Sequence, residues 1–165
     1  MASIVLVEDY IPLSTMLADF LRARGRHRVT SAANAQDGLT RIWAAKPDVV
    51  LLDLSLGDDD GMNVLRKAKA SGCQAKFLIM TGTSDVRKAV EAIKMGAEDY
   101  WTKPLKLETL HEQIELMLKK DPAQETVPPK PETHPDVASF FRSASQAKKQ
   151  TTKQTEAVNL LLQVN

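Results

Sequence analysis

VVLLD, at residues 49–53, consists of four consecutive apolar residues followed by one acidic residue. A short apolar run without alternation is typical of a strand that is covered by helices on both faces, as in a parallel α/β sheet. The chain alternates five times between runs of this kind and longer stretches with helical periodicity. This alternation predicts repeated βαβ units.

The periodicity predicts five strands and five helices in alternation. The predicted strands cover residues 3–7, 28–31, 49–53, 76–80 and 99–102, and the predicted helices cover residues 12–24, 35–45, 62–70, 85–95 and 107–119. The strand at 28–31 is the least apolar, so we expect it at an edge of the sheet. Asn34 and Ser84 are predicted N-caps, and Trp43 is predicted to cover the sheet edge.

Five polar or charged residues stand where the apolar runs end. They are Glu8, Asp9, Asp53, Thr81 and Lys103. Because the carboxyl ends of parallel strands share one edge of a sheet, we expect these side chains to converge there. Three carboxylates in one cleft are costly without a cation, and oxygen ligands favour Mg²⁺. The residues therefore predict a magnesium site, with Asp9, Asp53 and the Ser55 backbone carbonyl as ligands.

The chain from about residue 1 to about residue 120 resembles the receiver domain of two-component response regulators, the CheY-like family. The resemblance rests on VED at 7–9, LLDLSL at 51–56 with DG at 60–61, TG at 81–82, and GAEDYWTKP at 96–104. Gly57 and Trp101 depart from it, since the family commonly has proline and leucine or isoleucine there. The resemblance implies a flavodoxin-like fold: a doubly wound, five-stranded parallel sheet in the order 2-1-3-4-5, flanked by five helices.

The resemblance also implies a chemistry. Asp53 would accept a phosphoryl group from a phosphohistidine of a histidine kinase or phosphotransfer protein, in a reaction that needs Mg²⁺. Lys103 would offset charge on the transferring group, Thr81 would donate a hydrogen bond to it, and Glu8 would act on the metal through water. On this interpretation the protein is a phosphoacceptor that catalyses its own phosphotransfer, and not an enzyme acting on other substrates.

A switch and an output surface follow from the same resemblance. Movement of Thr81 toward a phosphoryl group would vacate space for Tyr100, and the output face would comprise the fourth helix, fifth strand and fifth helix. Ser55 and Thr83 stand where the family controls access of the hydrolytic water, which predicts some autodephosphorylation. Dimerisation through the output face is left open.

Composition bounds the class of protein. The 165 residues, of which 43% are hydrophobic, suffice for one domain plus an appendage. The net charge of +1 indicates neither nucleic acid nor an anionic membrane as a partner. No stretch approaches the roughly 18 apolar residues of a membrane span, and Cys73 is the only cysteine. We therefore expect a cytoplasmic protein.

The three histidines share no metal-ligand spacing and are predicted to be solvated surface residues: His27, His111 and His134.

After about residue 120 the composition changes. Residues 121–135 contain five prolines and no glycine, which predicts a semi-stiff linker. Residues 136–165 contain two apolar helical pieces around a basic, threonine-containing stretch. This tail either frays or docks as a helix on a downstream partner, on its own receiver or on a second copy. It is too small and too polar for a DNA-binding domain.

Three classes of function stay open. The first and favoured class is a phosphorylation-dependent switch of protein contacts, either stand-alone or as the N-terminal part of a longer regulator with an effector domain beyond residue 165. The second is an enzyme on the same fold, but aspartate-nucleophile phosphatases carry a second aspartate where this chain has Ser55, and the acids after the first strand would repel a flavin phosphate. The third is a phosphorylation-independent scaffold.

Overall fold

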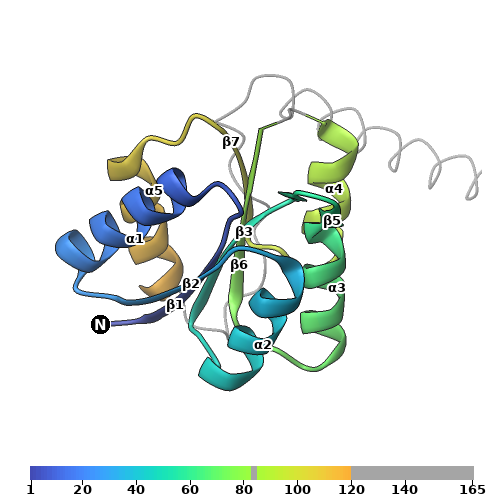
Figure 1. Cartoon of the computed structure of the whole chain (residues 1–165), viewed down its shortest axis with the longest axis horizontal. Coiled ribbons are helices and arrows are strands. Elements are labelled where there is room, and N and C mark those ends of the chain that lie inside the picture. Colours follow the sequence, from blue (N-terminus) through green and yellow to red (C-terminus); the bar gives the residue numbers. More distant parts are fainter. Residues whose placement is uncertain (83–84, 120–165) are drawn as a thin grey trace, which may run out of the picture. The chain divides into compact units, whose positions relative to one another are not determined.

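The computed structural model describes residues 1–82 and 85–119. The elements follow in the order β1 (Ser3–Val7), α1 (Ile11–Gly25), β2 (Arg28–Ala32), α2 (Ala35–Ala45), β3 (Val49–Asp53), β4 (Ser55–Leu56), β5 (Asp59–Asp60), α3 (Gly61–Ala70), β6 (Lys76–Thr81), α4 (Val86–Lys94), β7 (Asp99–Thr102) and α5 (Leu107–Lys119). Five parallel strands form one sheet in the order β2-β1-β3-β6-β7. Helices cover both of its faces (Figure 1).

The predicted architecture is confirmed. Strands β6 and β7 are the fourth and fifth strands of the sheet, so its order is the expected 2-1-3-4-5, with β2 at an edge. Every predicted strand and helix is present, with ends that shift by one residue at most. The doubly wound flavodoxin-like fold places the carboxyl ends of β1, β3, β6 and β7 side by side.

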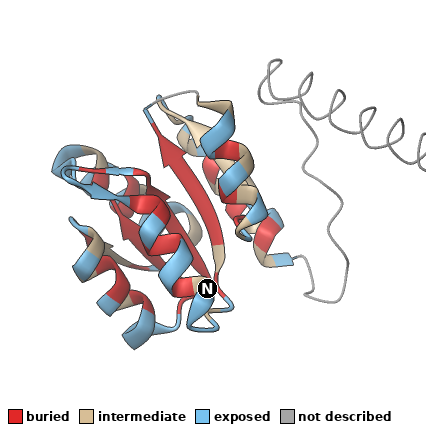
Figure 2. Ribbon diagram, turned by 90° about the vertical axis from the view of Figure 1, so that its right-hand side faces the viewer, coloured by how far each residue is buried: buried red, intermediate tan, exposed pale blue. Residues whose placement is uncertain are grey.

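The core consists of two apolar layers, one on each face of the sheet. Alternate residues of a single strand enter different layers: in β1, Val5 and Val7 join the layer under α2 and α3, whereas Ile4 and Leu6 join the layer under α1 and α5. All four side chains are fully buried. Burial on both faces explains why the inner strands are continuous apolar runs, and Figure 2 shows it as buried strands between half-buried helices.

The sequence did not predict the hairpin that follows Asp53. Strands β4 and β5 pair antiparallel, Ser55 opposite Asp60 and Leu56 opposite Asp59, with Gly57 in the turn at a φ of 61°. Two residues per strand are too few to give a period-2 signal. The hairpin shapes the loop directly after the predicted phosphoacceptor.

Capping is predicted correctly for one of two helices. The Asn34 side chain accepts a hydrogen bond of 2.8 Å from the Asp37 backbone N–H, as expected of an N-cap. The N-cap of α4 is Asp85, whose side chain accepts from the Arg87 N–H, so the prediction of Ser84 is wrong by one residue. Aspartate and serine are equally good caps, and the sequence alone does not rank them.

Two predicted surface assignments are wrong. Trp43 does not cover the sheet edge: it is half-exposed and its Nε1–H donates to Ser71 Oγ, at 3.1 Å, which joins α2 to the end of α3. His27 is buried, with 5% of the residue exposed, and His111 is half-buried.

His134, the linker 121–135 and the tail 136–165 lie outside the described residues. Within residues 1–82 and 85–119, no helix has the length and apolarity needed to cross a bilayer.

Candidate functional site

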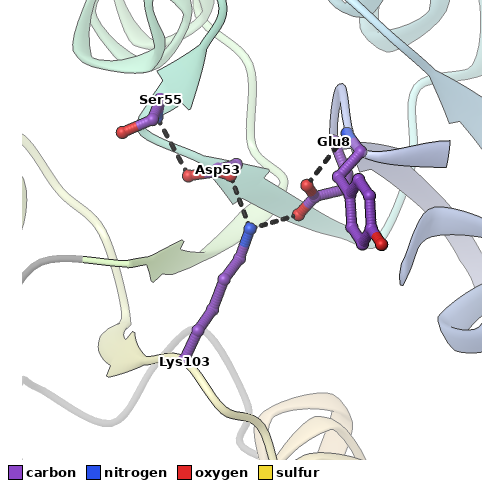
Figure 3. Close-up of polar contacts among 5 residues, drawn as sticks. Glu8, Asp53, Ser55 and Lys103 are labelled. Carbon is purple, nitrogen blue, oxygen red and sulfur yellow. Dashed lines mark hydrogen bonds and ion pairs between the residues drawn. The ribbon is translucent and has the colours of Figure 1, made fainter. Parts of the chain in front are cut away.

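Four neighbouring strands bring the predicted residues to one edge of the sheet. Glu8 follows β1, Asp53 ends β3, Thr81 ends β6 and Lys103 follows β7. Glu8, Asp53 and Thr81 are buried, with exposed fractions of 0%, 3% and 1%. For Glu8, Asp53 and Lys103 the convergence expected from the sequence is present: Figure 3 shows Lys103 extending toward Glu8 and Asp53.

Lys103 lies between two carboxylates. Its Nζ is 2.7 Å from Glu8 Oε2 and 2.6 Å from Asp53 Oδ2, and both contacts are charge-assisted hydrogen bonds (Figure 3). The Lys103 backbone N–H donates to the Thr81 carbonyl oxygen at 2.7 Å. This main-chain contact fixes the segment that carries the ammonium group over the sheet edge.

Burial and pairing act together on the protonation of these groups. Burial raises the pKa of Glu8, and the neighbouring Asp53 charge adds to this, although the hydrogen bond from Lys103 opposes it. Burial of Lys103 disfavours its charge, but the hydrogen bonds to Asp53 and Glu8 outweigh that effect and raise the pKa of Lys103. The ammonium group is therefore a permanent positive charge beside Asp53 at neutral pH.

Backbone amides orient the two buried carboxylates. The Ser55 N–H donates to Asp53 Oδ1 at 2.9 Å, and the Tyr10 N–H donates to Glu8 Oε1 at 3.2 Å. Asp53 thus presents one oxygen to the amide of the β4–β5 hairpin and the other to Lys103. Its carboxylate is held in one orientation before any ligand arrives.

An acidic cluster adjoins this pair. Carboxylate oxygens of Glu8, Asp9 and Asp53, one from each residue, lie within 4.8 Å of one another, and Asp9 is exposed. Three carboxylates against the Lys103 ammonium leave a net charge of about two negative units, which a divalent cation would neutralise. An all-oxygen donor set with an open, solvent-facing side suits Mg²⁺, which retains part of its water shell.

Thr81 and Tyr100 are already in contact. Their side chains share a hydrogen bond, and Tyr100 packs against the apolar layer under α2 and α3. Burial raises the pKa of Tyr100, so its hydroxyl is protonated at neutral pH. The predicted switch pair is therefore adjacent, whereas Thr83, the predicted water-access residue, falls in residues 83–84, outside the described chain.

Gly61 is a positioning residue whose role the sequence reasoning missed. A Cβ atom there would lie 2.1 Å from the Asp53 carbonyl oxygen and 2.7 Å from the Leu54 Cα, and the Gly61 N–H donates to the Leu54 carbonyl oxygen at 2.9 Å. Only glycine permits this approach. The sequence carried a signal for this role: glycine is a poor helix former, yet Gly61 is the first residue of α3.

A comparison with protein families shows which family the chain belongs to. Residues 4–115 match the response regulator receiver domain. The chain belongs to this family. The receiver resembles, among curated proteins, the transcriptional regulatory protein ZraR of Salmonella typhimurium, with 37% identity over 115 residues, which are 70% of this chain and 26% of that regulator.

Solved structures give the same answer. The signal receiver domain of a putative Luxo repressor protein from Vibrio parahaemolyticus superimposes with a TM-score of 0.68 at 28% identity, over 72% of this chain and 90% of that one. A response regulator from Burkholderia pseudomallei, solved with a phosphorylated aspartic acid, a calcium ion and citrate, has a TM-score of 0.63 at 26% identity, over 70% and 72% of the two chains. The curated relatives are longer: this chain spans about a quarter to about half of their length.

Proposed function

We propose that this receiver is a phosphorylation-dependent switch in which Asp53 accepts a phosphoryl group. One observation carries the proposal: the buried Asp53 carboxylate is aligned by the Ser55 amide, lies 2.6 Å from Lys103 Nζ and adjoins the carboxylates of Glu8 and Asp9. The Burkholderia pseudomallei relative carries a phosphorylated aspartic acid, which supports the same chemistry here.

The transfer reaction needs a nucleophile and a compensated charge. An Asp53 carboxylate oxygen attacks the phosphorus of a phosphohistidine on a histidine kinase or phosphotransfer protein. The new P–O bond forms as the P–N bond breaks, and the imidazole of the donor leaves with the bonding electron pair. Little covalent work is left to the protein, so positioning and electrostatic stabilisation supply most of the catalysis.

The metal would be held mainly by Asp9 and Asp53, together with the Ser55 carbonyl, while Glu8 acts through water. When bound, Mg²⁺ offsets the charge of the transferring group. Asp53 Oδ2 is engaged by Lys103, so this contact must loosen before that oxygen can bind a phosphorus atom. Lys103 then forms an ion pair with a phosphoryl oxygen. The Thr81 hydroxyl donates a hydrogen bond to another phosphoryl oxygen.

The Thr81–Tyr100 hydrogen bond links this site to the face formed by α4, β7 and α5. Once the Thr81 hydroxyl turns to the phosphoryl group, the Tyr100 hydroxyl loses its hydrogen bond to Thr81 and the Tyr100 side chain can move. Two packings of this region that differ by a few kcal/mol are enough for a switch. We propose that a downstream protein, a second copy or an effector domain responds to this face. The C-terminal tail is a further element through which it could act.

Intact mass after incubation with a small phosphodonor tests the proposal. The wild-type protein should gain one phosphoryl group in the presence of Mg²⁺ and none when the metal is chelated, and Asp53→Asn should gain none. Asp59→Asn, which removes an exposed acid of β5, should behave like the wild type. A folded protein that gains no phosphoryl group from either the small donor or a phosphorylated kinase would support the scaffold interpretation.

A further inference from the structure

A second cluster of potential metal ligands lies at the other end of the strands from Asp53, where the parallel strands begin. His27 directly precedes β2, and Ala2 directly precedes β1, whose residue Ser3 pairs with Arg28. The cluster is therefore at the amino-terminal edge, away from the strand ends that carry Asp53. Its other members, His111 and Glu115, lie four residues apart on α5 and so occupy the same side of that helix.

Among residues 1–82 and 85–119, two buried nitrogen atoms of this cluster make no hydrogen bond. They are His27 Nε2 and His111 Nδ1. The His27 side chain is only 2% exposed, and its Nε2 is 3.2 Å from Glu115 Oε1. Because His27 Nδ1 accepts a hydrogen bond from the Ala2 N–H, the His27 proton lies on Nε2, where it faces this Glu115 oxygen. Buried polar atoms without partners are rare and costly, so His111 Nδ1, for which no such polar contact is found among the described residues, points to a missing ligand.

The three side chains converge closely enough to share one ion. One ligand atom from each of His27, His111 and Glu115 lies within 4.8 Å of the other two. Ligand atoms around a tetrahedral Zn²⁺ are roughly 3.3 Å apart, given Zn–N bonds of about 2.0–2.1 Å. The Glu115 side chain is 37% exposed, so it has the freedom to close the remaining gap.

The surrounding packing holds both imidazole rings in place. A Cβ atom on Gly25 would lie 2.2 Å from His27 Nε2 and 2.3 Å from its Cδ2, so the ring rests directly on the glycine backbone. The Phe20 ring makes an edge contact with His111, at a centroid distance of 6.3 Å. Two rigid ligands and one adjustable carboxylate make a site that is largely formed before an ion arrives.

An access route lies beside the cluster. A pocket of about 250 Å³ adjoins His27 and Glu115. Its lining consists of Met1, Ala2, His27, Asp48, Glu115 and Leu118. The pocket lets an ion reach the buried His27 ring, and it leaves room for a water molecule as a fourth ligand.

We propose that His27, His111 and Glu115 form a binding site for a borderline transition-metal ion, with Zn²⁺ as its probe. Two imidazoles and a carboxylate suit Zn²⁺, Ni²⁺ or Cu²⁺ and not the hard Mg²⁺ ion of the Asp53 site. Burial lowers the pKa of the His27 imidazole, with Glu115 opposing this, so the neutral form that binds metals prevails at neutral pH. The bound ion would link α5, through His111 and Glu115, to the loop between α1 and β2, through His27.

Binding has a structural consequence at the N-terminal segment. The Ala2 backbone N–H donates to His27 Nδ1 at 3.3 Å, which requires a lone pair on that nitrogen. A neutral His27 that binds an ion through Nε2 carries its proton on Nδ1. The Ala2 contact must therefore break when the ion binds, and the Ala2 amide reports on occupancy.

Calorimetric titration of Zn²⁺ into the full chain, with Mg²⁺ in excess to occupy the acidic site, tests this proposal. We expect one high-affinity Zn²⁺ per chain in the wild type. The variants His111→Ala and Glu115→Gln, which alter half-buried side chains and spare the buried His27, should each bind at least about tenfold more weakly. Glu112→Gln, an exposed acid on the same helix, should bind as the wild type does.

Nuclear magnetic resonance on the same titration identifies the ligands. The imidazole nitrogens of His27 and His111 and the Ala2 amide should shift together, with the stoichiometry seen by calorimetry. The proposal is overturned if no Zn²⁺ binds under these conditions, or if binding survives His111→Ala and Glu115→Gln. It is equally overturned if affinity depends instead on Cys73 or His134, tested as Cys73→Ser and His134→Ala.

Discussion

Lys103 Nζ lies 2.6 Å from Asp53 Oδ2 and 2.7 Å from Glu8 Oε2, so one ammonium group bridges carboxylates from two strands of the sheet. Both carboxylates are buried. The bridge stabilises the resting site and places a positive charge where a phosphoryl group would arrive. The same contact must open for phosphorylation, which makes Lys103 central to stability and to transfer.

Lys103→Ala should slow phosphorylation of Asp53 by roughly 10²-fold or more, because a preorganised positive charge is lost from the site of developing negative charge. The rate of phosphoryl gain from a small donor, followed by intact mass, measures this. Lys106→Ala, which truncates an exposed lysine three residues further on, is the matched control. An unchanged rate in Lys103→Ala would remove this residue from the mechanism.

Mg²⁺ should stabilise the folded protein through the acidic cluster. Binding to the folded state alone raises the free energy of unfolding by about 2.7 kcal/mol when the ion is at 100 times its dissociation constant. Asp9→Asn should abolish most of this gain and leave the fold intact, because Asp9 is exposed. Urea unfolding with and without Mg²⁺ provides the measurement. Asp58→Asn, an exposed acid in the turn, should retain the full gain.

The features predicted from sequence are those encoded locally. Apolar runs that end in Asp53 or precede Glu8 specify both a strand and the edge at which its last side chain emerges, so the fold and the site could be read together. His27 shows the limit of such reasoning. Its burial depends on the ring of His111 and the carboxylate of Glu115, which only the packing of α5 brings near, and nothing in the sequence around His27 indicates them.

Gly61→Ala should disturb the phosphoacceptor without touching a charged group. The added Cβ would lie 2.1 Å from the Asp53 carbonyl oxygen, so the end of β3 or the start of α3 must move. We expect a loss of about 1–3 kcal/mol in the free energy of unfolding, as for other overpacked sites, and slower phosphorylation. Gly82→Ala places its Cβ more than 4 Å from every described residue other than its chain neighbours, and the free energy of unfolding of this variant should change by less than about 0.5 kcal/mol.

Tyr100→Ala should leave phosphorylation of Asp53 intact and uncouple it from the face formed by α4, β7 and α5. The aromatic ring packs against the core and its hydroxyl shares a hydrogen bond with Thr81, so its removal breaks the link between the two regions. Amide hydrogen exchange in α4 and β7, compared before and after phosphorylation, should change in the wild type and not in the variant. Tyr100→Phe separates the two contributions: it keeps the ring and loses only the hydrogen bond. An exchange response of wild-type size in Tyr100→Ala would show that the signal leaves Thr81 by another route.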